Sequence, residues 1–100
     1  MPTAGTYLEQ NFPNPFNPVT RSAFGLDRPA SISLRVYDAA GHLARVIAEG
    51  GRSASHYVEV WDGREGTGQA VASGVYFCRL DAGSFTQTRK MILLSGPSLF

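Results

Sequence analysis

Apolar and polar side chains alternate without a break in the stretch SISLRVY, residues 31–37. Ile32, Leu34 and Val36 fall on one side of an extended chain, and the residues between them fall on the other. This alternation is typical of a strand with one buried face and one exposed face. Residues 31–37 are therefore predicted to form a strand of an antiparallel sheet.

A hairpin is predicted directly after this strand. Asp38-Ala39-Ala40-Gly41 reads as a turn in which the aspartate can cap the backbone and Gly41 can adopt a positive φ. Residues 42–48 are expected to return as a strand, although their apolar residues occupy both parities and leave the register open. A short helix is the less favoured alternative, because valine and isoleucine in the middle of this stretch prefer strands. Residues 49–53 are expected to form a loop.

Four further stretches are predicted to be strands, and together they set the fold class. They lie at residues 20–26, 56–61, 74–80 and 85–94, with a long irregular connection over 62–73 and a glycine-closed turn at 81–83. About six or seven short strands at this spacing, without a periodic helix, are typical of a β-sandwich. The predicted fold is an all-β, immunoglobulin-like antiparallel sandwich of about seven strands.

A proline-rich segment precedes the strand at 20–26. It reads QNFPNPFNP over residues 10–18, and its three prolines fix φ and remove backbone donors, which makes it unsuitable as a central strand. We expect an extended arm that Phe12 and Phe16 clip against the domain, in preference to a proline-rich ligand motif. The expected division of the chain is a linker remnant over 1–6, the sandwich over 7–94 and a tail over 95–100.

Length and charge limit the function classes. A chain of 100 residues supports one domain with one core. The net charge of +1 comes without a dense basic face, which argues against nucleic-acid binding. No apolar run approaches the ~20 residues of a membrane helix, and residues 1–6 lack the basic and apolar regions of a signal peptide.

The sequence offers no pattern of residues that supports catalysis, and no cofactor is expected. His42 and His56 stand at a turn and at a strand start without a paired nucleophile, so the protein is predicted not to be an enzyme. Cys78 is the only cysteine and is predicted to lie in the core. Asp62 and Glu65 are weak calcium candidates, because their loop supplies hard oxygen ligands but lacks the EF-hand spacing.

Several motifs, taken in order, resemble one known family. The segments QNFPNPFNPVT, VYD with the following Gly41, WDGR, ASGVYF and TRKMILL are similar to the type A C-terminal sorting domains of the type IX secretion system and to the related immunoglobulin-like domain of the flagellar hook-capping protein. The positions that the resemblance marks are Asn14, Pro15, Phe16, Asn17, Pro18, Tyr37, Asp38, Gly41, Trp61, Asp62, Gly63, Ser73, Gly74, Val75, Tyr76, Arg89 and Lys90. The resemblance implies a sandwich at the end of a large secreted bacterial protein, recognised by the outer-membrane translocon and often removed after export.

Three functions follow as hypotheses. The first is a non-catalytic C-terminal sorting and anchoring domain that takes a secreted bacterial protein to the cell surface and whose partners are proteins of the translocon. The second is a structural or assembly module, either similar to the hook cap or self-associating. The third is an accessory carbohydrate-binding module, which requires Tyr37, Tyr57 and Trp61 to be exposed in a row on one sheet face.

The predicted last strand, residues 85–94, is the expected binding site for a protein partner. A partner can add a strand to an exposed sheet edge through backbone hydrogen bonds. Truncation after Gly83 is expected to abolish both folding and export.

Overall fold

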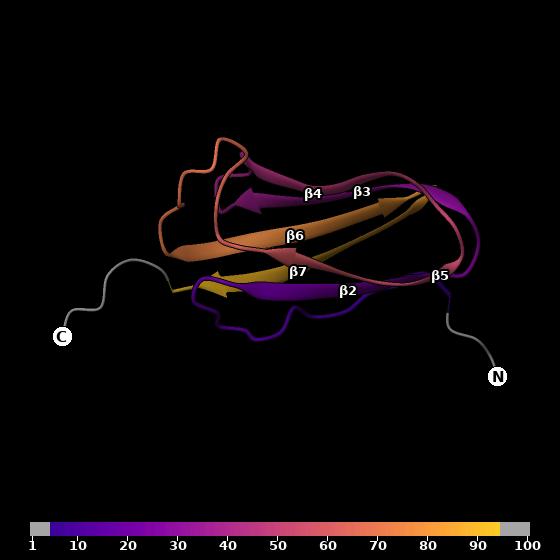
Figure 1. Ribbon diagram of the computed structural model, residues 1–100, viewed down its shortest axis with the longest axis horizontal. Helices are drawn as coiled ribbons and strands as arrows, with labels where there is room; N and C mark the ends of the chain where they lie inside the picture. The colour runs from indigo at the N-terminus through magenta and orange to yellow at the C-terminus, as the bar shows by residue number, and fades with distance from the viewer. Residues whose placement is uncertain (1–4, 95–100) are drawn as a thin grey trace.

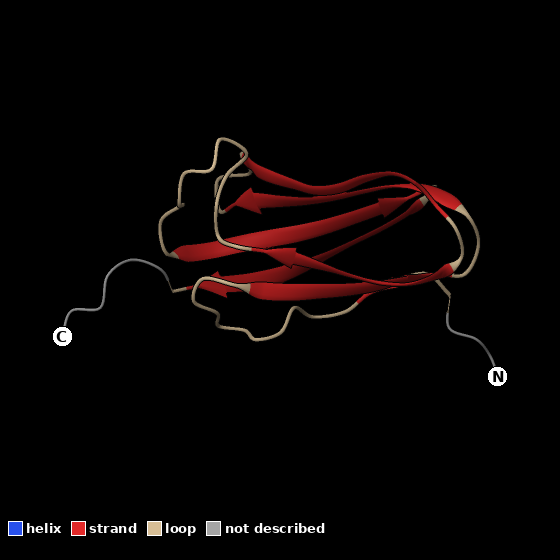
Figure 2. Cartoon of the chain, viewed as in Figure 1, coloured by secondary structure: helices blue, strands red, loops and turns tan. Residues whose placement is uncertain are grey.

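The computed structural model describes residues 5–94 and consists of strands and loops, with no helix among the described residues (Figure 2). The seven strands are β1 (Tyr7–Leu8), β2 (Thr20–Leu26), β3 (Ala30–Asp38), β4 (Leu43–Arg52), β5 (Ser55–Trp61), β6 (Gly74–Ala82) and β7 (Phe85–Leu93). They form a three-stranded sheet in the order β1-β2-β5 and a four-stranded sheet in the order β4-β3-β6-β7 (Figure 1). All pairings between these strands are antiparallel. The predicted sandwich is confirmed. The expected tail at 95–100 and the first four residues of the expected linker lie outside the described residues.

Alternation along β2 and β3 places their apolar residues between the two sheets. Ile32, Leu34 and Val36 of β3 are buried, as the sequence predicts. The same holds for the side of β2 that carries Phe24 and Leu26. Burying alternate side chains on both sheets gives one continuous core, which provides most of the stabilising free energy of such a fold.

Strand β4 is longer than predicted. The expected loop at 49–53 is wrong over most of its length, because Gly50 and Gly51 pair with Ile32 and Ser31 of β3 and the strand ends only at Arg52. The pair of glycines suggests a loop in the sequence, yet Gly50 uses its positive φ of 113° inside the ladder. Two register shifts in the β3–β4 pairing also explain why the apolar residues of β4 occupy both parities.

The β6–β7 hairpin is tighter than predicted. Strand β6 runs two residues beyond Leu80, so that Ala82 pairs with Phe85. Only Gly83 and Ser84 remain in the turn, and Gly83 has a φ of 61°. A positive φ at the first residue of a two-residue hairpin turn is the geometry that glycine adopts most easily.

Strand β1 was not predicted from the sequence. Tyr7 pairs with Gly25 of β2, and a Cβ atom at Gly25 would lie only 2.3 Å from the Tyr7 ring. The absence of a side chain at Gly25 therefore leaves room for the aromatic ring of Tyr7 at this position. Residues 9–18, here called the N-terminal arm, follow β1 and lead into β2.

Candidate recognition surface

The N-terminal arm is held against β2 by a compact set of hydrogen bonds. Phe12 and Arg21 exchange two backbone hydrogen bonds of 2.9 Å. The buried Asn11 side chain donates to Thr20 Oγ1 at 2.9 Å and to the carbonyl of Pro13 at 3.1 Å. The Thr20 hydroxyl donates to the same Pro13 carbonyl at 2.8 Å. These bonds satisfy polar groups that the arm and β2 bury between them.

The far end of the arm reaches the end of β7, and in Figure 1 the two segments approach each other at the left of the sandwich. The Phe16 N–H donates to the carbonyl of Ile92 at 3.0 Å, and the Leu94 N–H donates to the carbonyl of Phe16 at 2.8 Å. The Ile92 N–H is accepted by Asn14 Oδ1 at 2.9 Å. At Phe16 the arm therefore forms a parallel bridge with Leu93 at the edge of β7.

Side chains extend this contact along the rest of the strand. Gln10 Nε2 donates to the carbonyl of Lys90 at 2.7 Å. The Leu8 N–H donates to Gln87 Oε1 at 3.0 Å, and Arg89 Nε donates to the carbonyl of Leu8 at 2.9 Å. We call these contacts between residues 8–16 and 87–94 the arm–β7 clasp. The clasp occupies much of the edge of β7, which is the edge where the sequence predicts pairing with a partner strand.

Phe16 anchors the arm in the core. Its side chain is 2% exposed, and its ring lies 5.8 Å from that of Trp61, which in turn lies 5.4 Å from the ring of Tyr76. The Trp61 indole donates to the carbonyl of Arg64 at 2.9 Å, so that its polar edge is satisfied. Three motif positions from three distant segments thus meet in one aromatic cluster.

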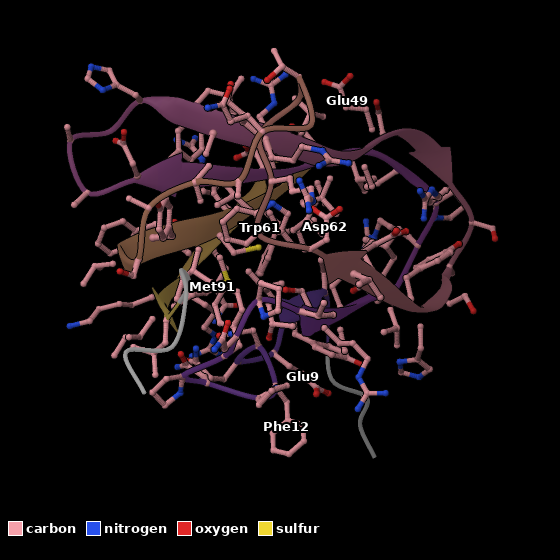
Figure 3. All side chains as sticks on the ribbon, turned by 60° about the vertical axis from the view of Figure 1, so that its left-hand side comes forward. Glu9, Phe12, Glu49, Trp61, Asp62 and Met91 are labelled. Carbon is pink, nitrogen blue, oxygen red and sulfur yellow. The ribbon has the colours of Figure 1, made fainter. Side chains whose placement is uncertain are left out.

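Phe12 does not help to clip the arm, contrary to prediction. Its side chain is 69% exposed and points away from the sandwich, whereas Trp61 lies between the strands (Figure 3). The reason is the backbone pairing of Phe12 with Arg21, which places both side chains on the outer face of the β1-β2-β5 sheet.

Gly63 lies where the loop after β5 passes the arm. Its φ is 74°, and a Cβ atom there would lie 3.0 Å from the carbonyl oxygen of Pro18 and 3.2 Å from the Pro18 Cβ. Both the backbone angle and the space favour glycine. The tryptophan–aspartate–glycine motif and the end of the proline-rich motif are therefore in direct contact.

Replacing Gly63 with alanine is expected to destabilise the domain by roughly 1–3 kcal/mol, because the variant combines a left-handed backbone angle with a close approach to Pro18. Urea denaturation followed by tryptophan fluorescence measures the change. The matched control is Gly66→Ala, since Gly66 has open space around its Cβ position and no positive φ. Equal losses for the two variants would contradict this assignment.

Comparison with known proteins identifies the family. The family model of the FlgD Ig-like domain matches residues 12–84. The chain belongs to this family. A search of the curated proteins gave no match.

Solved structures carry the same fold as this FlgD-like domain. The dimeric latent PorU of Porphyromonas gingivalis superposes with a TM-score of 0.66 at 17% identity, over 94% of this chain and 10% of that one. FlgD of P. aeruginosa gives a TM-score of 0.58 at 20% identity, over 74% of this chain and 58% of that one. PorZ, a bacterial surface component of the type IX secretion system of P. gingivalis, gives 0.53 at 19% identity, over 90% of this chain and 11% of that one. The FlgD-like domain thus spans about a tenth of the length of PorU and PorZ.

The hairpin motif of the FlgD-like domain is a capped turn. Asp38 Oδ1 accepts the backbone N–H groups of Ala40 at 2.9 Å and of His42 at 2.8 Å. These hydrogen bonds to the charged form, the one from His42 first, hold the pKa of the Asp38 carboxyl below its usual value. Gly41 supplies the positive φ of 90° that was predicted for it. Asp38 and Gly41 therefore shape the β3–β4 turn.

The remaining motif positions are distributed over the sheet and its loops. Tyr37 pairs with Phe77, and Phe77 pairs with Lys90, so the three residues form one row across the four-stranded sheet. Lys90 and Tyr37 thus share the outer face of that sheet. Ser73 precedes β6, and Gly74 and Val75 begin it; Pro15 and Asn17 are exposed in the arm.

Asp62 and Glu65 are engaged by protein groups. Asp62 Oδ1 accepts the N–H of Arg64 at 3.1 Å and lies 3.4 Å from an Arg45 guanidinium nitrogen. Glu65 Oε1 accepts the hydroxyl of Thr67 at 2.8 Å. Within residues 5–94, no three histidine, cysteine or acidic side chains come together as a metal site. The structure therefore gives these two carboxylates turn-stabilising roles.

The groups with nucleophilic or acid–base chemistry are separated. Cys78 is buried, and burial raises the pKa of its thiol to about 11, so the sulfur remains protonated near neutral pH. Its placement in the core is confirmed. His42 lies 3.4 Å from the Asp38 carboxylate at the exposed turn, whereas His56 is hydrogen-bonded to the Tyr7 hydroxyl at the other end of the sandwich.

No helix of the described chain is long and apolar enough to cross a membrane.

The three aromatic residues proposed for carbohydrate binding do not form an exposed row. Trp61 is buried, and Tyr57 lies on the inner face of β5 with its ring 5.2 Å from that of Phe24. Tyr37 is on the outer face of the other sheet. The candidate recognition surface is therefore the arm–β7 clasp, where motif residues from both ends of the domain lie together.

Proposed function

We propose that this FlgD-like domain is a non-catalytic C-terminal sorting and anchoring domain, which directs a secreted bacterial protein through the outer-membrane type IX translocon to the cell surface. Its partners are proteins of the secretion machinery, and it uses no cofactor, nucleic acid or membrane insertion. The fold shared with PorU and with PorZ, the latter a component of the type IX system, supports this proposal.

The arm–β7 clasp is the observation on which the proposal depends. Asn14 and Phe16 from the N-terminal motif and Arg89 from the C-terminal motif contribute to it, although they are more than 70 positions apart, as in the bond between Ile92 and Asn14. Exposed groups surround it, among them Asn17 and Lys90. A receptor that binds there would contact both ends of the folded domain, and it would not bind an unfolded chain in the same way.

A reporter fusion tests the proposal. Residues 1–100 are attached to the C-terminus of a reporter that carries a signal peptide, and surface display is measured in a host with a functional type IX system. Display is expected in that host and is expected to be lost in a translocon mutant and in the reporter without the domain. A folded fusion that remains in the periplasm of the competent host would overturn the proposal.

A structural or assembly role is the second candidate, and the match to the FlgD family favours it. In that case the domain would position neighbouring subunits, and its removal would leave export unchanged while preventing assembly. The same fusion separates the two roles, since an assembly module gives no surface display of the reporter.

A further inference from the structure

The two sheets have four edge strands, and three of these edges are protected against pairing with another chain. Strand β1 is only two residues long, and β7 is covered by the arm–β7 clasp. Strand β4 has an irregular ladder with two register shifts and contains Gly50 and Gly51. Short length, coverage and bulges are the usual means by which proteins prevent unwanted edge pairing.

Strand β5 has none of these protections within the described chain. It pairs with β2 in an unbroken register over all seven of its residues, from Ser55 to Trp61. It contains no proline, glycine or lysine. Val58 and Val60 are 59% and 55% exposed, so this edge also carries apolar side chains in contact with solvent.

The hydrogen bonds of β2 show which backbone groups of β5 are free to pair. Arg21 exchanges both of its backbone hydrogen bonds with the arm, and the carbonyl of Ala23 accepts the N–H of Glu9. Because successive residues of a strand direct their backbone groups to opposite sides, the alternate set that includes Ser22 bonds to β5. Ser22 pairs with Glu59, so the backbone N–H and C=O groups of Glu59, and of the β5 residues at the same parity, are bonded to β2.

The backbone groups of His56, Val58 and Val60 therefore point toward the open side. Their side chains lie on the outer face of the sheet, opposite Gly25, Ala23 and Arg21 respectively. The same residues thus provide free hydrogen-bonding groups and exposed apolar surface, which are the two requirements for strand addition.

The sequence of this edge is complementary to itself. If two β5 strands pair antiparallel about Val58, each Val58 faces its counterpart and each His56 faces Val60 of the second copy. The hydrogen-bonded pairs are then formed only by residues whose backbone groups point to the open side, as an antiparallel ladder requires. The residues brought together at the centre carry no formal charge when the histidine is neutral, so no like charges oppose each other.

The inner face of such a pair is complementary in charge. Arg52 lies 3.3 Å from Glu59 Oε2 and 5.1 Å from the centre of the Tyr57 ring in the same chain. In the antiparallel arrangement, each Tyr57 faces Glu59 of the second copy. The Arg52 guanidinium group, which lies over the Tyr57 ring, would therefore lie beside the Glu59 carboxylate of its own chain and that of the second copy. This arrangement of charges favours association.

We propose that β5 is a self-association site, at which two copies of this chain pair antiparallel across a two-fold axis at Val58 and join their three-stranded sheets. This pairing leaves the arm–β7 clasp exposed, and it does not depend on the sorting role proposed above.

Sedimentation velocity over a concentration series of the full chain tests the proposal. The wild-type chain is expected to form dimers, and Val58→Lys is expected to raise the dimer Kd by at least about tenfold, because two lysines would then face each other at the axis. Val19→Lys is the matched control, since Val19 is 46% exposed and lies between the arm and β2, outside β5. Circular dichroism verifies that each variant is folded.

Site-specific cross-linking tests the geometry independently. Val58→Cys is expected to give a covalent dimer with a short bismaleimide, because the two positions adjoin the axis. Val60→Cys is expected to give none, because its counterpart is displaced by about 13 Å along the strands. Native Cys78 is buried and does not interfere. A wild-type chain that remains monomeric, including one that captures only other proteins, would overturn the proposal. So would a Val58→Lys variant that dimerises like the wild type, or equal cross-linking at positions 58 and 60.

Discussion

Replacing Phe16 with alanine should destabilise the domain by about 3–5 kcal/mol, which is the typical cost of deleting a buried aromatic side chain. Phe16 is 2% exposed and packs its ring against Trp61, so its loss leaves a cavity that the β-sheets cannot readily close. Denaturation in guanidinium chloride measures the change. Since domains of this size are only marginally stable, the variant is expected to be partly unfolded at physiological temperature.

The matched control for this variant is Phe12→Ala. Phe12 belongs to the same proline-rich segment but is 69% exposed, and its replacement is expected to change the stability by less than about 0.5 kcal/mol. The pair of variants separates anchoring in the core from the composition of the segment. Similar losses at both positions would show that the arm is held in a different way.

Ending the chain after Gly83 should abolish folding altogether. The truncation removes β7, and with it the buried side chains of Met91 and Leu93 and the ladder partner of β6 along its whole length. It also removes the backbone donors and acceptors that hold the arm to β7, so the arm loses its connection to the four-stranded sheet. Circular dichroism and amide proton dispersion are expected to report an unfolded chain.

A chain that ends at Leu94 is the control for this truncation, because it keeps all seven strands. This shorter chain is expected to fold. In the reporter fusion, the chain ending at Gly83 is expected to give no surface display. Display by an unfolded fusion would show that a linear signal is sufficient and that the folded surface is not what the receptor recognises.

The sequence predicts the two layers of this fold well, because a strand with one buried face shows a direct alternation of apolar and polar residues. Ile32, Leu34 and Val36 illustrate this, and the turn at Gly41 follows from local backbone chemistry in the same way. Strand β4 was harder to predict, since its register shifts place apolar residues on both parities and its glycines resemble a loop.

Contacts over long distances in the chain could not be read from local patterns. Phe12 and Phe16 both belong to the proline-rich segment, and only their pairing with Arg21 and with Leu93 decides which side chain enters the core. The arm–β7 clasp is of the same kind. The family resemblance marks the participating positions, yet only the structure shows that Asn14 bonds to the backbone of Ile92.

The bond from Ile92 to Asn14 joins positions separated by 78 residues, and it has a consequence for synthesis on the ribosome. The arm emerges early, but its partner strand is among the last parts of the domain to leave the exit tunnel. A polypeptide released too soon would lack the bonds between the arm and β7, and with them the finished surface. In the proposed sorting role, a receptor that requires this surface would therefore bind only chains that have been translated through to the last strand. Prematurely terminated chains would then not be exported.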